Sequence, residues 1–299
     1  MELLWIPIAL MAGLMQALRT AAQKAINAHV SAWMTTYIRS LWGLPFMAVY
    51  LWIVVNSTGL GVPVLHQTFF AHSAGAAFSQ VLGTYLLIRL FTLSNFAVGT
   101  MLTKTDVMQA AIIGSLFFSE TISGIGWIAI FLTVVGVILL SVRRPDALIA
   151  GGVSGAVMLT GLASAFWFCL SYLFLREASL SLDQGPMFYR AAWSVVAVTS
   201  IQVVVLGLWL LGQRRERAEF PKLPRLIRPS LFIGITSALG SIGWFTAMAM
   251  QNASYVKAVG QVEVVFTVLI STLWFRERIT AFQYAGIATI VVAVLLFVL

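Results

Sequence analysis

The sequence predicts an all-α polytopic membrane protein, with ten transmembrane helices arranged as two inverted five-helix repeats around a central cavity. Sixty per cent of the 299 residues are apolar and 9% are charged, whereas soluble domains have about 45–50% and about 25%. The apolar residues form continuous runs of about 20 residues, the length of a membrane-spanning helix. A transmembrane barrel would instead show alternating segments of about ten residues. Polar motifs of the first half also return in the second half at constant spacing.

Ten candidate spans follow one another along the chain, separated by short loops rich in Gly, Pro and charged residues. They lie approximately at 3–24, 32–55, 69–91, 95–118, 123–142, 148–175, 186–212, 229–250, 253–275 and 279–298. The first is interpreted as a retained helix, because it runs past the length of a signal-peptide core without a small-residue cleavage site. We expect residues 1–145 to form the first five-helix repeat and 146–299 the second.

The repeat is defined by residues that are uncommon in a bilayer. Three pairs are 157 residues apart: Asn95 with Asn252, Asp106 with Glu263, and Glu120 with Glu277. Two further pairs are 151 residues apart: Arg39 with Arg190, and Trp42 with Trp193. Five spans per half is an odd number, so the second half must enter the membrane from the opposite side. Inverted repeats of this kind place a midplane site where it can open to either face in turn.

Positive charge is concentrated in the loops after odd-numbered spans. These loops hold Arg89, Arg143, Arg144, Arg276, Arg278 and a basic run within 214–228, whereas the loops after even-numbered spans hold little besides Arg176. The positive-inside rule therefore predicts cytoplasmic odd loops and both termini outside. We expect the run at 214–228 to contact anionic lipid headgroups and not nucleic acid.

The chain resembles the EamA-type proteins of the drug/metabolite transporter superfamily. In that pattern the first helix ends near a Lys, an Arg follows about fifteen residues later, and the fourth helix ends in apolar-Glu-x-(Leu/Ile)-(Thr/Ser). Lys24, Arg39, Phe118-Ser-Glu-Thr-Ile-Ser123 and Phe275-Arg-Glu-Arg-Ile-Thr280 match it. The resemblance implies two five-helix halves and a transport function. It implies little about substrate, because members move amino acids, sugars, nucleotide-linked compounds, cations and drugs. Two features depart from it: the Trp-Gly often found in the first helix is absent, and members are usually drawn with cytoplasmic termini.

Asp106 and Glu263 are the strongest site candidates. A charge at a helix centre costs about 2.5–3.5 kcal/mol on insertion scales, so each carboxylate should face a cavity or a partner. Two interpretations stay open: a proton- or substrate-coupled carboxylate, and a structural ion pair. Lys104 is two residues from Asp106 and points away from it on the same helix. We therefore expect bridges between spans, Asp106 with Lys257 and Glu263 with Lys104.

Five cations are placed at membrane depth, namely Lys24, Arg39, Lys104, Arg190 and Lys257. Against two carboxylates they leave an excess of three, which would favour an anionic or carboxylate-bearing substrate if they face the cavity. Lys24 has a second interpretation, since it can snorkel to the interface. The candidate aromatic walls of the cavity are Trp167, Phe168, Tyr172, Tyr189 and Trp244. For these the alternative is a lipid-facing or core position.

The remaining polar positions are interpreted as structural. We expect Asn95 and Asn252 to be helix N-caps, and Glu120 and Glu277 to cap helices or bridge loops. The single Cys169 excludes an internal disulfide, and the three His residues have no metal-ligand spacing. We therefore expect no cofactor and no metal.

These features predict a secondary active transporter, in the export direction, that carries small metabolites by alternating access. Amino-acid-like or other carboxylate-bearing compounds are the expected substrates, with protons as the candidate coupling ion. The alternatives are a polytopic membrane enzyme and a flippase for lipid-linked substrates, but no catalytic pair is visible in the sequence. The chain also lacks the Gly-rich phosphate-binding loop of a nucleotide-driven pump. We expect a monomer or homodimer in the cell inner (plasma) membrane of a bacterium.

Overall fold

The computed structural model describes residues 3–26, 29–93, 99, 102–141, 154–275 and 280–297, and every regular element within these ranges is a helix. The elements are α1 (Trp5–Ile26), α2 (Ala32–Thr58), α3 (Gln67–Leu93), α5 (Asp106–Phe117), α6 (Gly124–Ser141), α8 (Gly155–Leu180), α9 (Met187–Gly212), α10 (Arg214–Arg217), the 3-10 helix η1 (Phe220–Leu226), α11 (Ile227–Met250), α12 (Ala253–Gly260), α13 (Val262–Phe275) and α14 (Ala281–Leu296).

Six stretches of the described chain are long and apolar enough to cross a membrane. They are Trp5–Gln23, Ala32–Thr58, Gly124–Ser141, Gly155–Leu180, Met187–Gly212 and Arg214–Met250, and α5 and α14 are shorter apolar helices. Large apolar side chains cover the outside of the bundle. Trp52, Phe117, Leu159 and Leu208, for example, are each at least 67% exposed. Such a surface is stable only in contact with lipid, so the chain is a multi-pass membrane protein.

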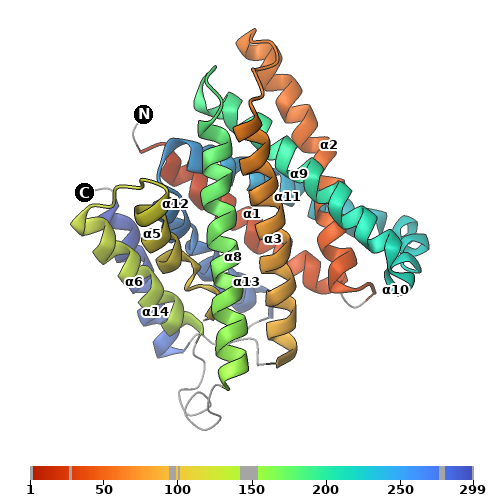
Figure 1. Cartoon of the computed structure of the whole chain (residues 1–299). Coiled ribbons are helices and arrows are strands. Elements are labelled where there is room, and N and C mark those ends of the chain that lie inside the picture. Colours follow the sequence, from red (N-terminus) through yellow and green to blue (C-terminus); the bar gives the residue numbers. More distant parts are fainter. Residues whose placement is uncertain are drawn as a thin grey trace.

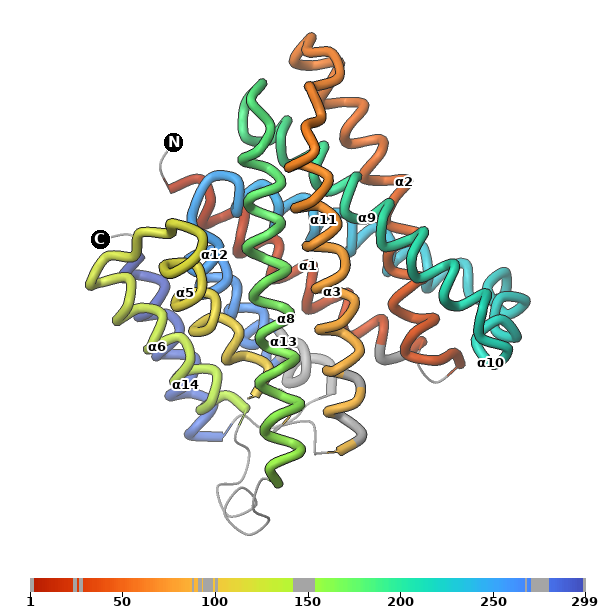
Figure 2. Tube along the Cα trace, in the orientation of Figure 1, coloured from red at the N-terminus to blue at the C-terminus, as the bar shows by residue number. Residues whose placement is uncertain are grey.

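The helices pack in long pairs. α3 lies along α8, α1 along α11, and α6 along α14 (Figures 1 and 2). Glycines allow the closest approaches. A Cβ on Gly286 would lie 2.7 Å from the carbonyl oxygen of Gly136 in the facing helix, and one on Gly234 would lie 2.6 Å from the carbonyl oxygen of Trp42. Small residues bring helix backbones together in membranes, where helices gain little from the hydrophobic effect on association.

Two predicted features of the segments that carry the carboxylates need correction. The predicted span 253–275 is not one helix, because α12 ends at Gly260 and α13 begins at Val262. Asp106 likewise begins α5 after a turn at residues 104–105, and it is not near the middle of a helix. Both acids therefore lie in the first turn of a helix, where free backbone N–H groups and the helix dipole stabilise negative charge. A break in a helix at membrane depth is tolerated where it lines a cavity.

The two ends of the chain lie near one another (Figure 1). The Trp5 ring at the start of α1 meets the Phe297 ring after α14 edge to face, with 6.3 Å between the centroids. The placement of both termini on the outside of the membrane stays a prediction.

The basic run at 214–228 forms α10, η1 and the start of α11. Its arginines and Lys222 are exposed, whereas Glu216 is buried. Glu216 accepts a 2.5 Å hydrogen bond from the Ser31 hydroxyl, and Glu219 accepts one of 2.8 Å from the Ser31 backbone N–H. The acids thus fix the segment to the N-terminus of α2 and leave the cations outward, as lipid contact would require.

A polar cavity as the candidate functional site

A cavity of about 310 Å³ lies between the helices, and residues of α1, α2, α3, α5, α8, α9, α11, α12 and α13 line it. Its wall combines hydroxyl and amide side chains with a few aromatic rings. Among the described lining residues, six are charged: Arg19, Arg39, Lys104, Asp106, Lys257 and Glu263. Four cations against two carboxylates leave an excess of two positive charges in this cavity.

Lys104 and Glu263 form an ion pair. The Nζ of Lys104 donates to Oε1 of Glu263 at 2.6 Å, and the two side chains are 16% and 13% exposed. The pair connects the turn before α5 with the first turn of α13. The predicted bridge between these residues is therefore confirmed.

The predicted bridge between Asp106 and Lys257 is not formed. Oδ2 of Asp106 instead accepts a 2.9 Å hydrogen bond from the Tyr172 hydroxyl, and Oδ1 is buried without a hydrogen-bond partner among the described residues. The Lys257 Nζ lies 4.3 Å from the centroid of the Tyr172 ring and 4.7 Å from that of the Trp244 ring. The two aromatic faces replace the carboxylate as the immediate partner of the ammonium, because a cation is attracted to the negative face of a ring. Tyr172 therefore contacts both charges.

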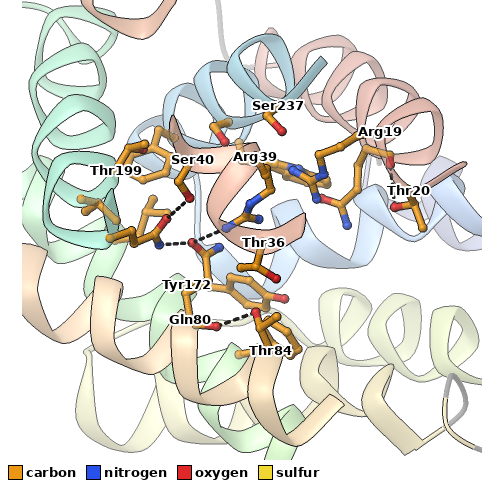
Figure 3. A pocket seen from close by; sticks show the side chains of 18 of the residues that line it. Arg19, Thr20, Thr36, Arg39, Ser40, Gln80, Thr84, Tyr172, Thr199 and Ser237 are labelled. Atoms are coloured by element: carbon orange, nitrogen blue, oxygen red, sulfur yellow. Dashed lines mark hydrogen bonds between the residues drawn. The ribbon is translucent and has the colours of Figure 1, made fainter. Parts of the chain in front are cut away.

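Neither of the two arginines that line the cavity forms an ion pair within the part of the chain that the structure describes. Arg39 donates from Nη2 to Oε1 of Gln80 across 3.5 Å. Arg19 is 8% exposed, and its buried Nε has no hydrogen-bond partner there. Figure 3 shows both side chains reaching into the same cavity, with Gln80 and Thr84 on the facing helix α3. The excess positive charge is thus located at Arg19 and Arg39.

Trp244 lines the cavity as predicted, and its Nε1 donates to Oε1 of Gln16 at 2.9 Å. Phe168 and Tyr172 line it too. Lys24 belongs to α1, but its side chain is outside the described part of the structure.

Arg190, Tyr189 and Trp167 are not among the lining residues. Arg190 lies in the first turn of α9 and donates to the carbonyl oxygens of Gly185 (2.9 Å) and Asp183 (3.4 Å). The prediction that Arg190 faces the cavity is therefore wrong, because its side chain binds backbone carbonyl oxygens just before the start of α9.

The other two residues are helix-packing residues. Tyr189 is buried and donates its hydroxyl to the Gly61 carbonyl. Trp167 packs edge to face on Phe78, with 5.8 Å between the ring centroids. Their predicted place in the cavity wall is therefore wrong.

Sequence reasoning missed Arg19. The signal was present, since an ionisable residue inside an apolar span is by default a functional candidate, and Arg19 stands within 3–24. It also missed Gln80 and Gln202, whose amides hydrogen-bond to one another beside Arg39. An uncharged amide is a weaker signal than a charge, because an amide costs less to bury in an apolar span.

Glu120 behaves as the sequence predicts, bridging to the start of a distant helix. Its carboxylate accepts from the backbone N–H of Ala253 at 2.6 Å and from the Ser254 hydroxyl at 2.8 Å, which caps α12. Nε of Arg176 lies 3.8 Å from the same carboxylate. Asn252 occupies the N-cap position without a capping hydrogen bond from its side chain, so only its position was predicted correctly. Glu277 and Asn95 lie outside the described residues.

A bundle of membrane-spanning helices around a charged, metabolite-sized cavity defines a protein of the membrane-transporter class. The EamA-like transporter family matches residues 3–142 and 184–299. The chain therefore belongs to the EamA-like transporter family, within the drug/metabolite transporter superfamily. A solved structure titled only "Crystal structure of protein" shares the fold with a TM-score of 0.71 and 12% identity, over 99% of this chain and 96% of its own. The search of curated proteins found no match.

Proposed function

We propose that the protein is a secondary active transporter that carries small carboxylate-bearing metabolites through this cavity by alternating access. One observation carries the proposal: Arg19 and Arg39 face the cavity without an acidic partner among the described residues. Buried charges are normally paired, because removing an unpaired charge from water is costly. A substrate carboxylate would supply the missing counter-charge, and guanidinium groups bind carboxylates with charge-assisted, often bidentate, hydrogen bonds.

The dimensions of the cavity support a small substrate. A volume of about 310 Å³ lies at the lower end of the range of about 300–1,000 Å³ for small-molecule sites. An amino acid, hydroxy acid or short dicarboxylate is the size of compound that this volume favours. The rings of Tyr172 and Trp244 add aromatic surface to the lining of the cavity.

The architecture that we propose is ten spans in two inverted halves, 1–145 and 146–299. Two separate segments of the chain match the family, as two related halves would. The packing between the halves is also consistent with a repeat: α3 of the first half packs on α8 of the second, and α11 of the second half packs on α1 of the first. Gly83 of α3 faces Phe168 of α8, and Gly240, 157 residues later, faces Met15 of α1. An inverted pair of bundles can rock about a fixed midplane site, which is the structural basis of alternating access.

Coupling would use the cavity carboxylates. Glu263 is held by Lys104, whereas Oδ1 of Asp106 has no hydrogen-bond partner in the described structure. We therefore propose Asp106 as the group that takes up and releases a proton. Export as the direction and a bacterial inner membrane as the location stay predictions from the sequence.

The test is transport in proteoliposomes that contain the purified protein. Counterflow of radiolabelled carboxylates, such as malate and isoleucine, is compared with that of matched compounds lacking the carboxylate, such as isoleucinamide and simple alkylamines. We expect carboxylates to exchange and to compete with one another. Exchange of amines in preference to carboxylates would overturn the proposal.

A further inference from the structure

A second hollow lies beside the cavity and differs from it in chemistry. It is an apolar groove of about 300 Å³ between α3 and α9, and Trp33 and Trp209, whose ring centroids are 4.7 Å apart, line it. Phe78 and Val205, on its two walls, are 62% and 48% exposed, so the groove opens at the lipid-facing surface. Among the described residues that line it, Gln202 is the only one with an amide, hydroxyl or charged side chain.

Gln202 lines the cavity as well as the groove. Its Nε2 donates to Oε1 of Gln80, and its Oε1 accepts a 3.3 Å hydrogen bond from the Ser40 hydroxyl. The same Oε1 of Gln80 accepts from Nη2 of Arg39 at 3.5 Å. The partition between the cavity and the groove is therefore a layer of amide side chains in contact with one of the two unpaired guanidiniums. For a ligand to extend from the groove to Arg39, the Gln202 and Gln80 amides would have to change rotamer, and long side chains have several staggered rotamers.

We propose that the groove binds the hydrocarbon chain of a single-chain anionic amphiphile whose carboxylate lies against Arg39 and Arg19. This inference rests on the proposed function and narrows its substrate class to carboxylates with a medium-length alkyl chain. A polar solute in the groove could hydrogen-bond to only one described side-chain amide, that of Gln202. An alkyl chain could instead pack against both indole rings and against the apolar side chains of α3 and α9. The chain must also belong to an anion, because the adjoining cavity has an excess of positive charge.

An anionic amphiphile can reach the groove directly from the bilayer. An amphiphile concentrates in the membrane, so it reaches a lipid-facing groove at a higher local concentration than a water-soluble metabolite does. Transfer of its chain from lipid into the groove brings little hydrophobic gain, and selectivity must come from packing against the groove walls. Chain length should therefore affect binding through fit, with an optimum, and not increase it with every added methylene.

Tryptophan quenching by a brominated chain tests the proposal directly. The full-length protein in zwitterionic nanodiscs is titrated with dodecanoate carrying bromine at its terminal carbons, which quenches indoles only at contact. We expect saturable quenching that unbrominated dodecanoate reverses and its methyl ester does not. Trp33→Phe/Trp209→Phe should remove the saturable component. The matched control Trp52→Phe, which removes an indole 67% exposed elsewhere on the surface, should retain it.

A groove-filling variant gives an independent readout. Ala74 is an exposed residue of the groove wall, and Ala74→Phe should weaken dodecanoate binding at least tenfold while leaving transport of short carboxylates unchanged. Val204→Phe adds similar bulk to α9 at a position that is 58% exposed and outside the groove, so it should have no effect.

The outcomes separate this inference from the proposed function. If short carboxylates are transported but neither chain length nor Ala74→Phe has any effect, the amphiphile proposal is overturned and the proposed function stands. Equal binding of the methyl ester, or quenching that never saturates, would also overturn it. Failure of every carboxylate, short or long, would overturn both.

Discussion

Lys104 and Glu263 stand 159 residues apart in the chain and form a 2.6 Å ion pair in the wall of the cavity. Lys104 lies in the turn before α5 and Glu263 in the first turn of α13, so the pair joins two places where the backbone enters a helix. Ion pairs at such positions can hold one conformation of a transporter closed, provided that they separate in the other.

We predict that Lys104→Met and Glu263→Met each destabilise the protein more than the double variant does. A single substitution leaves one charge buried without its partner, which costs about 3–5 kcal/mol, whereas a well-packed apolar pair is often neutral. Thermal unfolding of the purified variants in detergent measures this, and a double-mutant cycle should give a coupling free energy larger than the loss in either single variant. If the loss of stability in the double variant equalled the sum of the two single losses, Lys104 and Glu263 would not stabilise one another.

Asp106→Asn should leave the fold intact and abolish accumulation driven by a proton gradient. The amide oxygen can still accept the Tyr172 hydroxyl, which now lies 2.9 Å from Oδ2, so the packing persists. The amide cannot take up a proton, so gradient-driven uptake fails while exchange of substrate for substrate continues. Both fluxes are measured in the same proteoliposomes. Asp183→Asn is the matched control, because that side chain is 78% exposed and pairs with His66. Normal gradient-driven uptake by Asp106→Asn would assign Asp106 a structural role.

Arg19→Gln and Arg39→Gln should each weaken carboxylate transport by about 10- to 100-fold. A hydrogen bond to a charged group contributes about 1.5–3 kcal/mol, and each 1.4 kcal/mol is about a factor of ten. Arg190→Gln should leave the affinity unchanged, because Arg190 binds the carbonyls at the start of α9 and does not line the cavity. The concentration dependence of counterflow gives the affinities. Equal loss in all three variants would contradict the assignment of Arg19 and Arg39 to the substrate.

The contrast between Arg39 and Arg190 shows what the sequence could predict. The constant offset of 151 residues pairs the two residues in the predicted repeat, but it does not fix their depth. α2 begins at Ala32, seven residues before Arg39, whereas α9 begins at Met187, only three before Arg190. Arg39 therefore reaches the cavity, while Arg190 stays at the end of its helix. The carboxylates were found because charge is rare in apolar segments. The one-residue break at Gln261 leaves no trace in hydropathy, and the aromatic contacts of Lys257 depend on two other helices.

Gly286→Ala should destabilise the protein, and Gly124→Ala should not. A Cβ at 286 would lie 2.7 Å from the Gly136 carbonyl oxygen and 2.8 Å from the Leu140 backbone nitrogen, so α14 and α6 would have to move apart. Overpacking of this kind costs about 1–3 kcal/mol. A Cβ at 124 meets nothing within 4 Å, although both glycines belong to helices of the same pair. Unfolding in increasing SDS compares the two variants, and equal stability would show that α6 and α14 can separate freely.

Glu120→Ala should destabilise the protein by about 1–3 kcal/mol, the usual effect of leaving buried donors without a partner. The side chain is fully buried, and its carboxylate accepts from the Ala253 N–H and the Ser254 hydroxyl at the start of α12. Glu120→Gln retains an acceptor but loses the charge that stabilises the helix N-terminus, so its loss should be smaller. Thermal unfolding ranks the two variants. Glu177→Ala is the control, because Glu177 also lies 3.8 Å from Arg176 but does not cap α12. If Glu177→Ala proved as harmful as Glu120→Ala, the interaction with Arg176, and not the cap, would account for the stability.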